Sequence, residues 1–324
     1  MNLFWLTKHQ QQWQASIKTD HKPQAVIISG HQGVGKKSLL DLLLADLLCG
    51  AQQPACGACQ NCRLFQLGSH PDIKKLVPDK NLIKVSMVRE VTQFFTSTPH
   101  CSAHKVAIIE EAHLMNKAAA NALLKILEEP PGSGMLFLIT NHKQSLMPTI
   151  RSRCVELAVH LTPDEELRLP DWLSEQGDWQ VDQIVDALQL SDHHPLSALQ
   201  ILQDEQLDLV NEHLDLILQV LSGQASVSAV ARQLSELEDL QFWQHLQRYF
   251  LGLIKSLLNP RIPEINAAHP LNQFMKKAPK VVHILIELND LIQMIMVNLN
   301  TQIKKQLLIE SVLIEIKKPF NGGR

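Results

Sequence analysis

The sequence predicts an α/β domain built on a parallel sheet in its first half and an all-helical region after it. Short apolar runs alternate with longer helical patterns as far as residue 160, which is typical of a parallel sheet with crossover helices. Beyond Thr162 the strand patterns stop. With 324 residues, of which 45% are hydrophobic, the chain can bury several cores, and this excludes disorder over its whole length.

Five apolar runs are predicted to form the sheet. They are Ala25–Ser29, Ile73–Val77, Val106–Ile109, Met135–Thr140 and Cys154–Ala158. The patterns between them predict helices, which cover Lys36–Leu48, Ser86–Thr98 and Ala112–Glu128. Pro130 and Pro131 follow the last of these and cannot continue a helix. The sheet domain is therefore expected to end near residue 160.

The helical region is predicted to begin at a capping box. Glu165 follows Thr162 by three residues, so the two side chains can satisfy each other's backbone N–H groups. Two low-charge segments, Val281–Asn298 and Thr301–Lys317, have more apolar surface than one exposed helix can use, so we expect them to pack together.

Charge divides the chain into three parts. Residues 1–160 hold 17 Lys and Arg against 11 Asp and Glu, residues 161–205 hold 1 against 11, and residues 206–324 hold 12 against 11. We therefore expect three domains, over 1–160, 161–206 and 207–324. The net charge of −3 argues against a protein that wraps nucleic acid in a cationic shell, so any DNA contact is expected to be local.

The sequence predicts a cytoplasmic protein that does not enter a membrane. The first residues lack the charged and apolar regions of a secretory signal, and the longest apolar stretch is interrupted by His283, Glu287 and Asp290. In a reducing compartment, cysteines are more often metal ligands or free core residues than disulfides.

A phosphate-binding loop is predicted between the first strand and its helix. Gly30, Gly33, Gly35 and Lys36 match the pattern G-x-x-x-x-G-K, in which backbone N–H groups converge on phosphate and the lysine balances its charge. The alternative is a glycine-rich turn with an incidental lysine.

This loop departs from the pattern at its last position. Lys37 stands where a hydroxyl would bind Mg²⁺, and an ammonium has no lone pair to offer a metal. Ser38 comes one residue late, which turns its side chain by about 100° on a helix. Nucleotide binding is therefore possible in principle, whereas hydrolysis is expected to be impaired.

Two carboxylates follow the third predicted strand. Glu110 lies where a Mg²⁺-associated acid would be expected, although Asp is usual there, and Glu111 lies where an acid could orient an attacking water. The alternative is that both simply favour the N-terminus of a following helix.

Four cysteines predict a structural zinc site. Cys49, Cys56, Cys59 and Cys62 have the spacing C-x6-C-x2-C-x2-C, which lets four thiolates surround one metal and leaves no open position for catalysis. Two disulfides at this spacing would be strained. An iron–sulfur cluster or free thiols are the alternatives.

Taken together, these motifs resemble the clamp-loader ATPase family of the AAA+ class. They are the defective loop, the cysteine cluster after its helix, the run Glu110-Glu111-Ala112-His113 and the triplet Ser152-Arg153-Cys154. The resemblance covers essentially the whole chain and implies an AAA+ domain, a helical lid and a C-terminal collar. It further implies a pentameric ring, with motor subunits of the gamma or tau type and a delta-type subunit, that loads a sliding clamp on primed DNA.

The resemblance also assigns roles to individual residues. It implies that Arg153 reaches the γ-phosphate held by a neighbouring motor subunit, a task that suits a permanently charged guanidinium. Without the family, a surface arginine packed against an acid is the simpler interpretation. Thr140 falls at the family's first sensor position, although it could equally just end a strand.

The family pattern favours a chain that does not hydrolyse ATP itself. Leu196 stands where family motors carry a lid arginine, and a leucine cannot contact phosphate. Glu111 is then vestigial, Mg²⁺ is not expected, and ATP or ADP binding at Lys36 is doubtful. Two alternatives remain, an ATP-hydrolysing motor subunit of the same loader and a stand-alone zinc module that binds nucleic acid.

Overall fold

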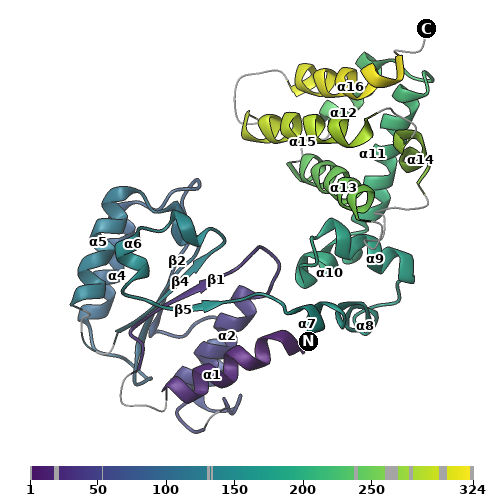
Figure 1. The fold of residues 1–324 in the computed structure, drawn as a ribbon. Coiled ribbons are helices and arrows are strands. Elements are labelled where there is room, and N and C mark those ends of the chain that lie inside the picture. The colour runs from purple at the N-terminus through teal and green to yellow at the C-terminus, as the bar shows by residue number, and fades with distance from the viewer. Residues whose placement is uncertain are drawn as a thin grey trace. The chain divides into compact units, whose positions relative to one another are not determined.

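The computed structural model describes residues 2–17, 22–52, 54–129, 132, 134–236, 240–259, 269–276, 280–298 and 305–321 (Figure 1). The chain divides into two compact units, Met1–Glu166 and Leu167–Arg324. The first is an α/β domain and the second is helical in its described parts, which confirms the predicted fold class. The expected division of the second unit at residue 206 stays a prediction.

A parallel sheet forms the centre of the first unit. In the described residues its strands are β1 Ala25–Ser29, β2 Ile73–Leu76, β3 Lys105–Ile109, β4 Gly134–Thr140 and β5 Val155–Ala158, in the order β2-β3-β4-β1-β5. The strand bounds differ from the predicted ones by one residue at most. All pairs are parallel, so every strand ends at the same edge of the sheet.

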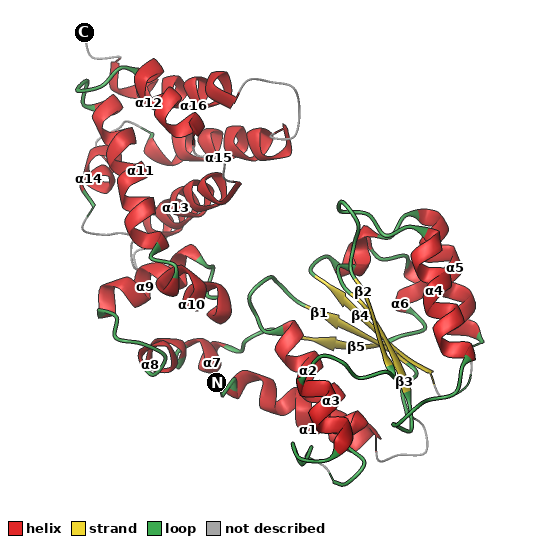
Figure 2. Ribbon diagram, turned by 180° about the vertical axis from the view of Figure 1, so that it is seen from behind, coloured by secondary structure: helices red, strands yellow, loops and turns green. Residues whose placement is uncertain are grey.

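Helices cover both faces of this sheet (Figures 1 and 2). The helices α1 Thr7–Ile17 and α2 Lys36–Leu48 lie on one face, and α4 Val85–Thr96 and α5 Lys117–Glu128 lie on the other. Side chains alternate between the faces along each strand. Ile27 and Leu138 join the buried core under α4 and α5, whereas Phe137 points the other way and contacts Trp13 of α1.

The remaining elements of this unit are short. They are the 3₁₀ turns Phe4–Leu6, Ala112–Leu114 and Lys143–Ser145, and the helices α3 Gln60–Gln66, α6 Pro148–Arg151 and α7 Pro163–Glu166. The predicted capping box is present before α7: Thr162 N–H donates to the Glu165 carboxylate at 2.8 Å, and Glu165 N–H donates to the Thr162 hydroxyl at 3.4 Å.

The prediction of one helix over Ala112–Glu128 was wrong in its first part. Met115 forms an isolated bridge with Ile83, and the backbones of Leu114 and Asn116 also hydrogen-bond to Ile83. These long-range bonds replace the first helical turns. Helix α5 begins only at Lys117, where the Asn116 side chain accepts from the N–H of Ala119 and caps the helix. The two prolines after it lie outside the described residues.

The second unit consists of packed helices. They are α8 Leu169–Ser174, α9 Val181–Leu190, α10 Pro195–Gln203, α11 Gln206–Leu221, α12 Val227–Glu236, α13 Leu240–Leu258, α14 Pro270–Lys276, α15 Val281–Asn298 and α16 Lys305–Asn321. Helix α15 has the predicted bounds and packs against α13 and α16. The first four residues of the predicted last helix, 301–304, lie outside the described residues.

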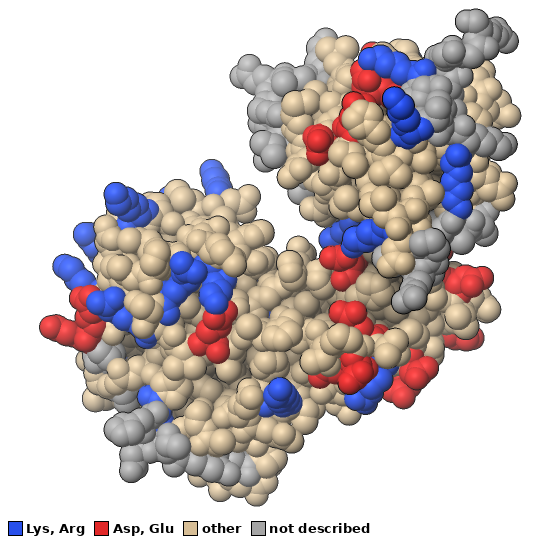
Figure 3. All heavy atoms as spheres, viewed as in Figure 1, with Lys and Arg blue, Asp and Glu red and all other residues tan. Residues whose placement is uncertain are grey.

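Acidic side chains gather over the first helices of the second unit (Figure 3). This matches the excess of Asp and Glu over residues 161–205. Among the residues that the structure describes, no helix is both long enough and apolar enough to cross a membrane.

Candidate functional site

The phosphate loop connects β1 to α2 and has the backbone that its glycines allow. Gly33 and Gly35 have φ values of +80° and +95°, in the left-handed region that side chains rarely adopt. Gly30 lies so close to the residue that follows β5 that a Cβ there would be 2.4 Å from the carbonyl oxygen of Val159. A residue larger than glycine at position 30 would therefore push Val159 away.

The side chain of Lys36 lies inside this loop. Lys36 is only 7% exposed, and its ammonium donates to the carbonyl oxygen of His31 at 2.6 Å. Burial, helped by the charge of Lys37 and opposed by that of Glu111, lowers the pKa of Lys36 to about 8. An anion in the loop would offset this cost, because it would supply the buried ammonium with a counter-charge.

Glu110 is held by two lysines. Its two carboxylate oxygens accept from Lys37 at 2.8 Å and from Lys75 at 2.6 Å, and its side chain is only 8% exposed. Burial opposes ionisation of Glu110, but the hydrogen bonds from the two lysines outweigh it and hold the pKa of Glu110 below its usual range. The carboxylate that could have assisted Mg²⁺ is thus paired with ammonium groups.

The strand register explains why Lys75 reaches Glu110. Lys75 of β2 lies beside Ile108 of β3, and Glu110 follows two residues later on the same face, towards α2. The loop hydroxyl does not complete a metal site with Glu110 either. Ser38 lines a cavity of about 640 Å³ with Asp41, residues of α1 and residues of the segment that carries the four cysteines, and Glu110 is not part of that lining. These residues do not fit Mg²⁺, which requires oxygen ligands in an open octahedral arrangement.

A polar cluster follows the ends of β3 and β4. The Asn141 amide donates to the Glu111 carboxylate at 3.1 Å, and His113 Nδ1 lies 3.6 Å from the same carboxylate. Thr140 is fully buried, and its hydroxyl accepts from the N–H of His142 at 3.0 Å and shares a hydrogen bond with His113. Thr140 therefore uses its hydroxyl within the chain.

Arg153 lies two residues before the start of β5 and is exposed. Its guanidinium forms an ion pair with Glu128 at the end of α5, at 3.0 Å, and donates to the carbonyl oxygen of Thr149 at 3.1 Å. Arg153 and Glu128 keep 39% and 52% of their side-chain surface exposed. An exposed pair of this kind contributes about 1 kcal/mol or less, so Arg153 can leave Glu128 at small cost.

Arg153 and the phosphate loop lie at opposite ends of two neighbouring strands. The loop follows the last residue of β1, whereas Arg153 precedes the first residue of β5, and the two strands are parallel neighbours in which Val26 pairs with Val155. A five-residue strand is about 16 Å long. Arg153 therefore does not reach the phosphate loop of its own chain.

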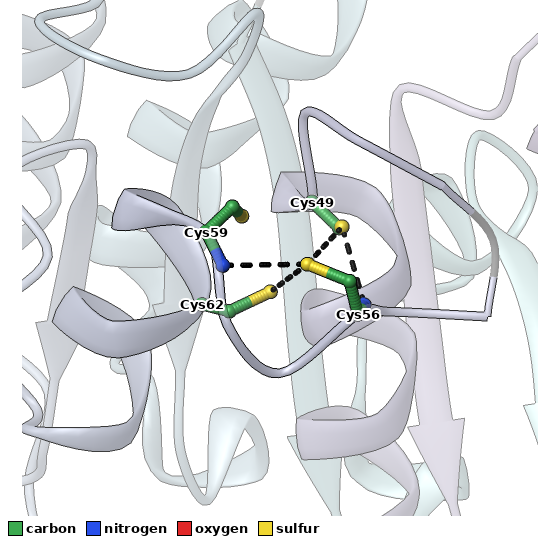
Figure 4. A group of neighbouring side chains, drawn as sticks. All are labelled: Cys49, Cys56, Cys59 and Cys62. Carbon is green, nitrogen blue, oxygen red and sulfur yellow. Dashed lines mark hydrogen bonds between the residues drawn. The ribbon is translucent and has the colours of Figure 1, made fainter.

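The structure brings the four predicted cysteines together (Figure 4). Their sulfur atoms all lie within 4.8 Å of one another, with 3.6 Å between Cys49 and Cys56 and 3.9 Å between Cys56 and Cys62. A tetrahedron of sulfurs around zinc has edges of about 3.8 Å. The donor set and its spacing thus fit a structural metal such as zinc.

Backbone and side-chain hydrogen bonds support this cysteine cluster. The N–H groups of Cys56 and Cys59 donate to the sulfurs of Cys49 and Cys56 at 3.4 and 3.3 Å. Such donors favour thiolates, which are the form that binds metals. Asn61 ties the cluster to the rest of the domain, because its amide donates to the carbonyl oxygens of Leu48 and Cys101.

A second group of metal-type side chains lies nearby, but its carboxylate is already occupied. His70, Asp72 and Cys101 have ligand atoms within 4.8 Å of one another. Asp72 is fully buried and accepts from the N–H groups of His100, Cys101 and Ser102 and from the Ser102 hydroxyl. These bonds fill its oxygens and give Asp72 a structural role.

Sequence reasoning missed Lys75 and Glu128. Lys75 lies in β2, far along the chain from Glu110, and only the register brings them together. An exposed glutamate at the end of a helix carries no motif, so Glu128 had no signal. The sequence does give a signal for Lys75 as a partner of Glu110. Lys75 lies near the end of a short strand, and all strands of a parallel sheet end on the side where Glu110 and Glu111 follow β3.

The strand order, the phosphate loop after β1 and the helical region after the sheet define a P-loop protein of the AAA+ class. Residues 5–163 match the model of the family described as "DNA polymerase III, delta subunit". The chain belongs to the DNA polymerase III delta-prime subunit family.

Two delta-prime subunits align with more than half of the chain. The delta-prime subunit of Escherichia coli is 37% identical over 207 residues, which cover 62% of this chain and 61% of the relative. That of Pseudomonas aeruginosa is 40% identical over 181 residues, 54% of each chain. The matches thus span less than two thirds of these relatives.

More distant similarities extend to other subunits. The tau subunit of E. coli is 32% identical over 222 residues, which cover 67% of this chain and 32% of the relative. A solved structure of a gamma subunit-related protein from Thermotoga maritima has 15% identity and a TM-score of 0.49, and the match covers 98% of this chain and all of that one.

Proposed function

We propose that this chain is the delta-prime subunit of a bacterial clamp loader and supplies Arg153 to the active site of a neighbouring ATPase subunit. It occupies one position in a five-membered ring with gamma- or tau-type motor subunits and a delta subunit. The ring loads a sliding clamp on primed DNA in the cytoplasm, and this chain contributes to it without hydrolysing ATP.

The position of Arg153 carries this proposal. The guanidinium is exposed, its partner Glu128 holds it weakly, and the chain's own phosphate loop lies at the other end of the neighbouring strands β1 and β5. A triphosphate that Arg153 contacts must therefore belong to another subunit. A guanidinium on the γ-phosphate stabilises the charge that develops as the phosphoryl group leaves.

The chain's own nucleotide site supports the non-hydrolysing role. Lys37 replaces the metal-binding hydroxyl, and Glu110 is paired with Lys37 and Lys75. Leu196 of α10 stands where the motor subunits have an arginine. Gly30, Gly33, Gly35 and Lys36 can still hold a phosphate group, so any residual nucleotide binding would depend on them.

The cysteine cluster has a structural role in this proposal. Cys49, Cys56, Cys59 and Cys62 bind one Zn²⁺, which fixes the segment between α2 and α3. Residues 161–206 form the lid and residues 207–324 form the collar that holds the ring together.

The test is reconstitution of the ring from motor subunits, a delta subunit and this chain, with ATPase measured in the presence of clamp and primed DNA. An arginine acting in trans accelerates phosphoryl transfer by about 10³-fold or more. Arg153→Ala should therefore abolish ATP hydrolysis at the one motor site that it serves. The ATPase rate of the ring should fall by the fraction that this site contributes. An unchanged rate with the variant assembled in the ring would refute the role.

Two matched variants make this test specific. Arg89→Ala removes another exposed arginine, on α4, and should leave the rate unchanged. Glu128→Gln removes the partner that holds Arg153 within the chain, and the rate should be maintained or raised. Size-exclusion chromatography confirms that each variant enters the ring.

A motor subunit is the second candidate. The buried Lys36 and the Glu111 carboxylate, placed by Asn141, favour it because both groups would be useful in hydrolysis. A motor would turn over Mg·ATP as an isolated chain at a rate that Lys36→Ala abolishes. Under our proposal, the isolated chain shows no such turnover.

A further inference from the structure

The acidic residue at the end of β3 is neutralised by the chain itself. Lys37 comes from the first turn of α2 and Lys75 from β2, and each binds a different oxygen of Glu110. The carboxylate is nearly buried, whereas the two lysine side chains are 65% and 54% exposed. Each ammonium can thus bind Glu110 and still keep part of its water shell.

A second carboxylate belongs to the same group. Asp41 lies one helical turn after Lys37 and therefore on the same side of α2. Burial and the charge of Glu110 raise the pKa of Asp41, while Lys75 and Lys37 lower it. Asp41 thus lies within the electrostatic influence of Glu110 and the two lysines, and the formal charges of the four groups cancel.

The two lysines stand where a divalent cation would be needed. Mg²⁺ bound beside the phosphate loop would require a hydroxyl at position 37 and a free carboxylate oxygen from Glu110. Position 37 instead carries an ammonium, and both oxygens of Glu110 accept from ammonium groups. A divalent cation would have to displace both lysines while their positive charges repel it.

We propose that Lys37 and Lys75 together replace the divalent cation at Glu110 and exclude Mg²⁺ from the phosphate loop of this chain. Lys75 is the residue that completes the exclusion, since Lys37 alone would leave one carboxylate oxygen open. The inference deepens the non-hydrolysing part of the proposed function and is independent of Arg153.

Removal of both lysines should create a metal site. Without the two ammonium groups, the nearly buried carboxylate of Glu110 loses both of its cationic partners, and free carboxylate oxygens bind hard divalent cations. The double variant Lys37→Thr/Lys75→Met also restores a hydroxyl at position 37. Both lysine side chains are more than half exposed, so the change removes little buried surface.

The experiment is a titration of the full zinc-loaded chain with Mn²⁺, with free Mn²⁺ measured by electron paramagnetic resonance. Mn²⁺ serves as the probe for Mg²⁺ because it prefers the same oxygen ligands. The double variant should bind one Mn²⁺ at least about tenfold more tightly than the wild type, a difference of about 1.4 kcal/mol. Adding Glu110→Gln to the double variant should abolish the gain.

A matched control removes two other lysines. Lys74 and Lys84 pair with Glu90 and Asp79, so Lys74→Met/Lys84→Thr changes the net charge equally without touching Glu110. This control should not gain Mn²⁺ binding. If it gains as much as the double variant, the effect is one of net charge and the proposal is wrong.

Two further results would overturn the inference. The first is a folded double variant, checked by circular dichroism, whose Mn²⁺ affinity equals that of the wild type. The second needs only the wild type and Glu110→Gln: Mn²⁺ binding by the wild type that this single substitution removes would show that the lysines do not exclude the metal. Neither result involves Arg153 or a partner subunit, so neither bears on the ring ATPase.

Discussion

Asp72 is expected to be one of the residues on which the stability of the first unit depends most strongly. Its carboxylate lies at the start of β2, fully buried, and fixes the loop before β3. Oδ1 accepts from His100 N–H at 2.6 Å, and Oδ2 accepts from the N–H groups of Cys101 and Ser102 at 2.9 Å each and from the Ser102 hydroxyl at 3.1 Å.

The size of the effect follows from these four bonds. Asp72→Ala leaves three backbone N–H groups without their acceptor, and each such loss costs about 1 kcal/mol or more, so we expect about 3 kcal/mol in total. Asp72→Asn can keep the amide oxygen at the Oδ2 position and loses mainly the bond to His100 and the charge. It should cost about 1–2 kcal/mol.

Thermal unfolding followed by circular dichroism measures this difference. For a domain of this size, 1 kcal/mol shifts the melting temperature by about 2–4 °C, so Asp72→Ala should lower it by about 6–12 °C. Ser102→Ala is the control, because it removes only the hydroxyl bond. If Asp72→Ala shifts the melting temperature no more than this control, the carboxylate does not hold the loop in place.

The effect of Asp72 should also depend on pH. Burial opposes its ionisation, but the N–H donors of Cys101, His100 and Ser102 outweigh burial and hold the pKa of Asp72 well below its usual range. A lowered pKa in the folded state gives stability that is complete above the unfolded pKa of about 3.9. The gap between wild type and Asp72→Asn should therefore be constant from pH 5 to 8 and shrink below pH 4.

Two further predictions concern the cysteine cluster and the phosphate loop. Cys56→Ser removes the sulfur that lies near both Cys49 and Cys62, so the zinc content measured by mass spectrometry should fall from about one per chain to near zero, with a lower melting temperature. An equal zinc content in the variant would contradict the assignment of the ligands. Lys36→Met should raise the free energy of unfolding at pH 7 by about 1–3 kcal/mol, because the wild type buries an ammonium whose pKa has fallen to about 8. In the wild type this cost declines as the pH rises from 8 towards 10.5, so the gain measured by urea unfolding should shrink over that range, and a pH-independent gain would rule out the charge as its cause.

Local motifs were predictable from the sequence, and the partners that come from distant segments were not. The glycines of the phosphate loop and the four cysteines lie within short segments, so their spacing alone indicates the geometry that they need. Lys75 and Glu110 meet only because β2 and β3 pair in one particular register. The sequence identifies the two acids but not the lysine that neutralises one of them.

The start of α5 shows the same limit for the prediction of secondary structure. Residues from Ala112 onwards have a helical pattern, yet Met115 pairs with Ile83, a residue about thirty positions earlier. Helical propensity is weak enough for such a tertiary contact to override it. Asn116 then provides the cap from which the helix can start.

Strand β5 links two features at its opposite ends. Val159, just beyond its last residue, lies against Gly30 of the phosphate loop, and Arg153 stands just before its first residue. A hydrogen-bonded strand resists changes in length, so a displacement at one end is passed to the other as a shift of the whole segment. The chain thus contains a short, stiff connection between its phosphate loop and the exposed Arg153.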